Sequence, residues 1–286
     1  MASLKLLHVS DFHFLDEQLN LKALLKSKYW RTKRFIGWAN CRFKRSGEFS
    51  VAVREALLRK IADSDWDYLI ISGDITSLGT EREFEIAHKA LSPVFNGRRV
   101  IITPGNHDRY VRQSLRDKLL EQYFGNYLIQ PNKHYHSLPI LHLNDEVAVM
   151  MFDMALPRGL FSSRGKLIDS ISKFENAIKQ LPQSTKIKIG VGHYPTFLPK
   201  HITESYLHRL SKRHRVKRLL LNHDFKLYLH GHIHKSWSFQ PNTNRELICV
   251  NSGGCCRYGE GEYAGFHEIT IDDEQIEIKK HHLRFD

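Results

Sequence analysis

Cysteine is scarce in this sequence. Four cysteines occur in 286 residues, two of them adjacent and none spaced as a C-x-x-C zinc pair: Cys41, Cys249, Cys255 and Cys256. The pattern indicates neither a disulfide framework nor a cysteine-based zinc site. We therefore expect the chain to work in a reducing compartment, the cytoplasm.

Long apolar runs are also missing. A membrane-spanning helix needs about 20 apolar residues, whereas Val147–Leu156 is shorter and contains Asp153. The strand-like segment Leu4–Val9 leads directly to polar residues at Asp11, which leaves no room for a signal peptide. We expect a cytoplasmic protein without a membrane span, whose charge allows a peripheral position on the inner face of the cell membrane.

Acidic residues are too few to balance the basic ones. The sequence has 31 Asp and Glu against 43 Lys and Arg, a formal net charge of +12. This excess favours polyanionic partners, whether nucleic acid, an acidic membrane face or phosphorylated small molecules. Hydrophobic residues make up 41% of the chain, enough for a packed core. Without a linker, repeat or low-complexity tract, residues 1–286 are expected to form a single domain.

The apolar runs that do occur are short and suit strands buried on both faces. Those that end in polar clusters are Leu4–Val9, Tyr68–Ile71, Arg99–Ile102, Lys186–Val191 and Lys226–Leu229. Apolar residues at helical spacing alternate with them at Phe49–Ala62, Glu81–Phe95 and Leu167–Leu181. Later strands are predicted at Leu247–Asn251, Phe266–Ile271 and Gln275–Lys279, with a hairpin turn at Asp272-Asp273. This alternation of predicted strands and helices indicates a layered α/β fold.

Five polar clusters follow these strands and contain the residues that bind divalent metals. They are Asp11-Phe12-His13, Gly73-Asp74, Gly105-Asn106-His107-Asp108, Gly192-His193 and Gly231-His232-Ile233-His234. Carboxylate oxygens suit hard cations, and imidazole suits iron, manganese and zinc. Each cluster alone is a weak signal, because D-x-H or G-D is usually a strand end or a turn. Together, and in this order, they resemble the calcineurin-like metallophosphoesterase family.

The resemblance implies a four-layer αββα sandwich with two metal ions at one edge. One ion would be held by Asp11, His13, Asp74 and His234. The other would be held by Asp74, Asn106, His193 and His232, so that Asp74 bridges both. The ligand set accepts manganese first, or iron or zinc.

The resemblance also implies the reaction. A hydroxide bridging two metals would attack phosphorus in line, and the metals would take up phosphoryl charge. His107 matches the family's histidine that is not a ligand and would protonate the leaving oxygen. Asp108 would orient His107 through a hydrogen bond; the alternative is that Asp108 only caps its loop. Other histidines, such as His8, His230 and the His281-His282 pair, match no motif and are expected to be structural or exposed.

Leu21–Ser46 is a basic and aromatic insertion between the first two motifs. Lysines and arginines alternate there with Tyr29, Trp30 and Trp38, and no acidic residue occurs. This pattern is typical of an element that lies on an anionic membrane or holds a phosphorylated amphiphile, or that tracks a nucleic-acid strand. It is also typical of a helical hairpin that merely buries its aromatic residues. A second basic run, His208–Arg218, reads as a surface helix that flanks the same cleft.

Several substrates remain compatible with this pattern. The leading one is a lipid-linked or nucleotide-sugar diphosphate, as in the UDP-2,3-diacylglucosamine pyrophosphatases of lipid A synthesis. A cyclic-nucleotide phosphodiesterase shares the compact motif set, and a DNA nuclease suits the basic charge but usually carries additional parts. A non-catalytic metal-binding scaffold is disfavoured because every motif position is filled.

Overall fold

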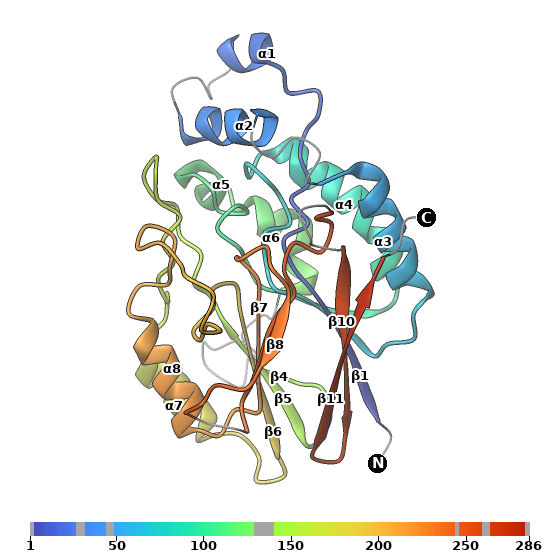
Figure 1. The fold of residues 1–286 in the computed structure, drawn as a ribbon, viewed down its shortest axis with the longest axis vertical. Coiled ribbons are helices and arrows are strands. Elements are labelled where there is room, and N and C mark those ends of the chain that lie inside the picture. The colour runs from blue at the N-terminus through green and yellow to red at the C-terminus, as the bar shows by residue number, and fades with distance from the viewer. Residues whose placement is uncertain are drawn as a thin grey trace.

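Two β-sheets form the centre of the protein in a computed structural model, which describes residues 3–26, 32–43, 49–128, 140–243, 246–258 and 264–283 (Figure 1). The first sheet has the order β11-β10-β1-β2-β3 and the second β4-β5-β6-β7-β9-β8. The first comprises β1 (Leu4–Val9), β2 (Tyr68–Ile71), β3 (Arg99–Ile102), β10 (Gly265–Asp272) and β11 (Gln275–His282). The second comprises β4 (Ile140–His142), β5 (Val147–Phe152), β6 (Ile187–Gly192), β7 (Leu227–His230), β8 (Trp237–Phe239) and β9 (Ile248–Asn251).

The parallel strands β1, β2 and β3 supply apolar side chains to both faces of the first sheet, as the sequence predicts. In β1, Leu6 lies in the core between the two sheets, whereas Leu7 and Val9 lie in the core beneath the helices. Because side chains alternate along a strand, a near-continuous apolar run supplies both cores. β1, β2 and β3 are parallel, so their carboxyl ends reach the same edge.

Helices cover the outer face of each sheet. The first sheet packs against α3 (Val51–Asp63), α4 (Glu81–Phe95) and α6 (Leu119–Phe124), and the second against α7 (Ile171–Ile178) and α8 (Arg213–Asn222). The remaining helical elements are α1 (Leu21–Lys26), α2 (Lys33–Phe43), α5 (Arg112–Arg116) and the 3-10 turn η1 (Gly125–Tyr127). The predicted αββα sandwich is therefore confirmed (Figure 1).

The clearest difference from the sequence prediction concerns α7. The apolar spacing predicts a helix over Leu167–Leu181, but the helix begins only after Ser170, whose hydroxyl accepts a hydrogen bond from the Lys173 backbone nitrogen. The preceding residues form an isolated bridge, Lys166 with Ser211, and a hydrogen bond from Ile168 N to Asp153 O. Tertiary pairing thus overrides the helical pattern at this end.

The basic aromatic insertion forms α1 and α2, which lie over the edge where the strands end (Figure 1). Its segments 27–31 and 44–48, including Tyr29 and Trp30, are outside the described residues. Arg34 anchors α2: its guanidinium is buried and donates to the carbonyls of Leu78 and Gly79 and to Ser114. Lys33 is also buried. These two cations therefore hold the insertion against the protein rather than presenting charge to a membrane.

The amino terminus of α4 contains a buried carboxylate whose charge is costly. Glu83 completes a capping box with Thr80 and also accepts from Leu78 N, yet it is fully buried. Burial raises its pKa to about 7, against the opposing effect of these backbone N–H groups. Because the folded-state pKa is raised, Glu83 favours folding below pH 4.5, and this contribution is lost as the pH rises to about 7.

We expect Glu83→Gln to prevent much of the loss of stability that the wild type undergoes over that pH range. Glutamine keeps an acceptor for Leu78 N and carries no charge. The free energy of unfolding of the variant should gain up to about 3 kcal/mol relative to the wild type between pH 4.5 and 7.5. Urea unfolding at both pH values measures the difference. Glu85→Gln, on the exposed side of the same helix, should keep the wild-type pH dependence.

Candidate metal centre

All five polar clusters meet at one edge of the sandwich. Asp11 and His13 follow β1, Asp74 follows β2, and Asn106 follows β3 in the first sheet. The second sheet adds His193 after β6, and His232 and His234 after β7. β6 and β7 are parallel, so their carboxyl ends also reach one edge. The topology thus explains how residues more than two hundred positions apart in the sequence become neighbours.

The backbone at this edge is strained in the same way at four of the expected ligands. Asp11, His13, Asp74 and His232 have φ values of 56°, 49°, 54° and 72°, in the left-handed region. Residues other than glycine adopt it at a cost of about 1–3 kcal/mol each. Cross-strand hydrogen bonds hold the conformation, from Asp11 N to Gly73 O (3.0 Å) and from His13 N to Asp74 O (3.1 Å). Such strain commonly marks functional sites.

The first group of ligand atoms comprises Asp11, His13 and His234. The Nε2 atoms of His13 and His234 are 2.9 Å apart, and Asp11 Oδ1 lies 3.8 Å from the first and 3.5 Å from the second. Atoms so close fit a single cation placed between them. Asp74 Oδ2 lies 3.9 Å from His13 Nε2, which places it within reach of the same cation.

The second group comprises Asp74, Asn106, His193 and His232. Asp74 Oδ2 lies 3.1 Å from His193 Nε2, and Asn106 Oδ1 lies 3.2 Å from that nitrogen and 2.9 Å from His232 Nδ1. Asp74 therefore borders both groups, in the position of a bridging ligand. The residues fit the two-metal partition implied by the sequence resemblance, and the donor set of carboxylate, amide and imidazole suits manganese, iron or zinc.

Backbone carbonyls fix which ring nitrogen of His193 and of His232 faces the centre. His193 Nδ1 lies 2.8 Å from Ser72 O, and His232 Nε2 lies 3.0 Å from His208 O. When each ring is neutral, donation to these carbonyls leaves the lone pair of its other nitrogen for a metal. Burial opposes protonation of His193, but Asp74 outweighs it and raises the pKa of the ring to about 9. The negative charge of Asp74 also favours the binding of a divalent cation.

The structure brings His107 to the centre and shows which backbone groups its neighbour Asp108 contacts. His107 packs edge-on against His13, and its Nδ1 lies 2.5 Å from Ser77 O. The Asp108 carboxylate accepts from Thr76 N and Gly105 N, both at 2.9 Å, and therefore ties together the loops after β2 and β3. Ser77 O engages the His107 ring, and the Asp108 contacts fit the alternative in which this carboxylate caps its loop.

Gly105 is required because it lies against the bridging ligand. A Cβ at this position would overlap the backbone nitrogen and a carboxylate oxygen of Asp74. We expect Gly105→Ala to displace Asp74, lower kcat/KM at least about a hundredfold and destabilise the fold by about 1–3 kcal/mol. Steady-state hydrolysis and urea unfolding measure the two effects. Gly125→Ala is the matched control, since a Cβ there meets no atom within 4 Å, and it should leave both quantities unchanged.

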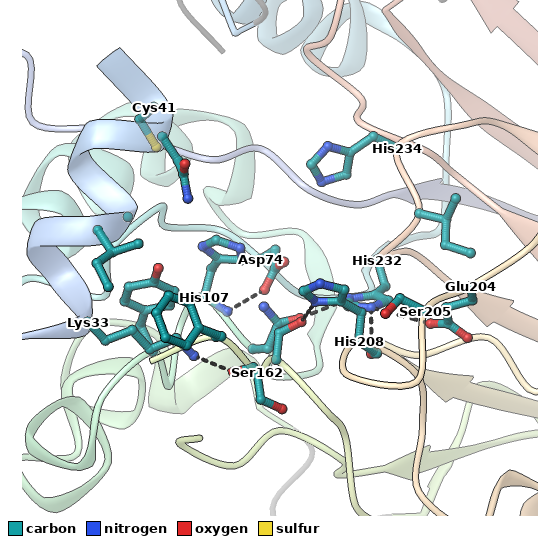
Figure 2. A pocket seen from close by; sticks show the side chains of 18 of the residues that line it. Lys33, Cys41, Asp74, His107, Ser162, Glu204, Ser205, His208, His232 and His234 are labelled. Carbon is teal, nitrogen blue, oxygen red and sulfur yellow. Dashed lines mark hydrogen bonds and ion pairs between the residues drawn. The ribbon is translucent and has the colours of Figure 1, made fainter. Parts of the chain in front are cut away.

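A cleft of about 700 Å³ opens over the ligands. One wall comes from α2, which contributes Lys33 and Cys41, and the opposite wall comes from the loop before α8, with Glu204 and His208 (Figure 2). Lys33 Nζ donates to Ser162 O (2.8 Å) and lies 4.5 Å from the Tyr110 ring centre. Burial lowers the pKa of Lys33 to about 8, so the amine is still mainly protonated at neutral pH.

The sequence analysis did not single out Glu204. Its side chain is 4% exposed and lies 3.4 Å from His232 Nε2 and 3.7 Å from Arg213. Burial raises its pKa to about 7, despite the opposing effect of Arg213. No motif includes Glu204, and only the neighbouring basic run indicated that this segment borders the cleft. The predicted surface helix in that run is α8, which begins at Arg213.

Comparisons with known proteins identify the family and similar folds. A family model described as calcineurin-like phosphoesterase matches residues 4–236. A dimetal phosphatase from Danio rerio is similar in structure, with a TM-score of 0.65 and 12% identity over 97% of this chain and 95% of that one. The NAD nucleotidase of Haemophilus influenzae gives a TM-score of 0.49 and 15% identity over 99% of this chain and 50% of that one. No curated protein matches the sequence.

Proposed function

This chain belongs to the calcineurin-like phosphoesterase family and is a metal-dependent phosphoester hydrolase, and we propose that its substrate is a diphosphate or phosphodiester with a lipid part. A lipid-linked nucleotide-sugar diphosphate such as UDP-2,3-diacylglucosamine is the leading candidate. One observation carries the proposal: helix α2 of the basic aromatic insertion lines the same cleft as several of the expected ligands. Lys33 of that helix borders the same cleft as Asp74 and His107.

Three residues at the cleft have a defined task in the proposed reaction. Two divalent ions, when bound, supply Lewis acidity and activate water. Asp74 would be a ligand of both ions. His107, in its imidazolium form, would donate the proton on Nε2 to the leaving oxygen, because Nδ1–H donates to Ser77 O. Lys33 lies where a second anionic group of a diphosphate would follow the reacting phosphoryl group along the cleft.

Two features support an anionic, amphiphilic substrate over a simple ester. The net charge of +12 gives the surface a field that attracts anions. The insertion that covers the centre carries both cations and large apolar side chains, which suits a phosphorylated lipid at a membrane face. Among the described residues, no helix is both long and apolar enough to cross a bilayer. Contact with an anionic membrane would therefore be peripheral.

A substrate panel tests the proposal. Manganese-loaded protein is given UDP-2,3-diacylglucosamine in mixed micelles, cyclic AMP, single- and double-stranded DNA, and bis-p-nitrophenyl phosphate. The proposal expects a kcat/KM for the lipid substrate well above all others. A preference for cyclic AMP or DNA would refute the substrate while keeping the metal centre, and inactivity on the whole panel would favour a scaffold.

A further inference from the structure

A second cavity, of about 670 Å³, lies beside the metal centre, and we name it the side cavity. Its walls come from the loop after His13, from α2 and from the segment before α3. The cleft borders α2 at Lys33, Gly37 and Cys41, whereas the side cavity borders it at Trp38, Cys41 and Arg42. Because residues three and four apart share a helix face, the two cavities occupy adjoining faces of α2 and meet at Cys41.

The side cavity begins at the metal ligands themselves. His13 and Phe49 both line the side cavity. The Phe49 ring packs edge-on against His13 and His234, with ring centres 4.8 and 5.5 Å apart. His13 therefore belongs both to the expected metal site and to the wall of the side cavity.

The side cavity has apolar side chains on several of its walls. The apolar side chains that line it are Leu15, Leu19, Leu21, Trp38, Phe43 and Phe49. Two of them are unusually exposed for such residues, Leu21 at 47% and Phe43 at 77%. Apolar side chains gathered around a cavity next to a catalytic centre form a surface that gains free energy when a ligand covers it.

Three polar side chains of the cavity, and the Trp38 indole, are engaged by the protein. Asp16 accepts from Gln18 N and Asn20 accepts from Ala23 N, both at the start of the insertion. The Ser77 hydroxyl donates to His13 O, and the Trp38 indole donates to Leu19 O. A nucleobase requires hydrogen-bond partners for its edge, and each of these groups already makes one hydrogen bond within the protein. A hydrocarbon chain requires none.

We propose that the side cavity binds a hydrocarbon chain of the substrate while its phosphoryl group occupies the metal centre. The inference rests on the proposed function, because it places the lipid part of that substrate at a defined site. The volume lies within the range of roughly 300–1,000 Å³ typical of ligand pockets. Glu17 and Arg42, at exposed positions, would meet the solvated end of the chain.

A homologous series tests the proposal on the manganese-loaded full chain. The substrates are p-nitrophenyl phosphodiesters with methyl, butyl, hexyl and octyl groups, used below their aggregation concentrations. Burying one methylene contributes about 0.8 kcal/mol, so kcat/KM should rise about fourfold for each added methylene, mainly through KM. Leu21→Ser and Phe43→Ser should reduce this increment to about twofold or less, while the methyl ester is hydrolysed at the wild-type rate.

The control and a readout independent of turnover complete the test. Ile168→Ser removes a side chain of matching exposure, 46%, away from both cavities and should retain the fourfold increment. Octylphosphonate should change the tryptophan fluorescence of the wild type, and Trp38→Phe should abolish most of that change.

The possible results distinguish the side-cavity proposal, the choice of its occupant and the proposed function. A kcat/KM that does not depend on chain length, with the methyl ester still hydrolysed, would overturn the side-cavity proposal and leave the proposed function intact. A stronger response to a nucleoside phosphonate than to octylphosphonate at Trp38 would overturn the choice of occupant. Loss of all hydrolysis with the octylphosphonate response retained would support the side cavity and refute the proposed function.

Discussion

Asp74→Asn is expected to lower kcat/KM by at least about a thousandfold, because one carboxylate borders both groups of metal ligands. An amide oxygen is a weaker ligand than a carboxylate and cannot neutralise charge on two cations. Loss of one bound cation removes several kcal/mol of transition-state stabilisation. Asparagine also tolerates the left-handed conformation at φ 54° and keeps an acceptor for His107 N, so the fold should survive.

Asp273→Asn provides the matched control for this substitution. Asp273 has nearly the same backbone conformation, with φ 52°, in the hairpin turn between β10 and β11. It makes one exposed ion pair, with Lys186 at 3.6 Å. This variant should retain full activity and metal content. If Asp74→Asn retained wild-type turnover with two metals bound, the bridging assignment would be wrong.

His107→Gln is expected to slow catalysis without loss of metal. General-acid catalysis contributes about 10²- to 10⁴-fold when the leaving group is a poor one, such as an alkoxide. The variant should therefore lose at least about a hundredfold in kcat for a dialkyl phosphate. It should lose about tenfold or less for p-nitrophenyl esters, whose leaving group needs little protonation. Comparing the two kcat ratios separates proton donation from substrate positioning.

The control for His107 is His214→Gln on the exposed surface of α8. It should leave both rates unchanged. Equal losses for good and poor leaving groups in His107→Gln would refute the general-acid role and indicate electrostatic stabilisation instead. Metal content, measured on the same samples, shows whether the ring of His107 contributes to metal binding through its contact with His13.

Several strands, and the residues that gather at the candidate metal centre, could be predicted from the sequence because each carries its own local signal. The strands β4, β5 and β8 were not predicted. β1, β2 and β3 have the predicted boundaries, since a strand buried on both faces reads as an unbroken apolar run. The ligand clusters follow such runs and match an ordered family pattern. These features depend on residues adjacent in the chain, which sequence reasoning can inspect directly.

Other features could not be predicted because they depend on contacts across the fold. Asp108 lies next to His107 in sequence, yet its carboxylate binds Thr76 N, thirty-two positions away. Glu204 belongs to no motif and becomes part of the cleft only when the loop before α8 folds over His232. Arg34 belongs to a basic stretch that suggests a solvated face, but Leu78 O and Gly79 O bind it in the interior.

The basic aromatic insertion therefore combines two roles that its composition alone does not separate. Arg34 and Trp38 hold α2 in place, through Leu78 O and Leu19 O. The neighbouring face of α2 presents Lys33 to the cleft, and exposed Phe43 borders the side cavity. A test of membrane binding should therefore change exposed cations such as Lys22 and Arg42, rather than buried ones whose loss would release the helix.

A metal titration tests the central claim most directly. Metal-free protein is titrated with Mn²⁺ while calorimetry gives the stoichiometry and bis-p-nitrophenyl phosphate reports hydrolysis. We predict two ions bound per chain, with most of the activity appearing as the second site fills, and fewer than two ions with negligible activity in Asp74→Asn. A single site, or hydrolysis that does not depend on added metal, would contradict a dinuclear phosphoesterase built on these seven ligands.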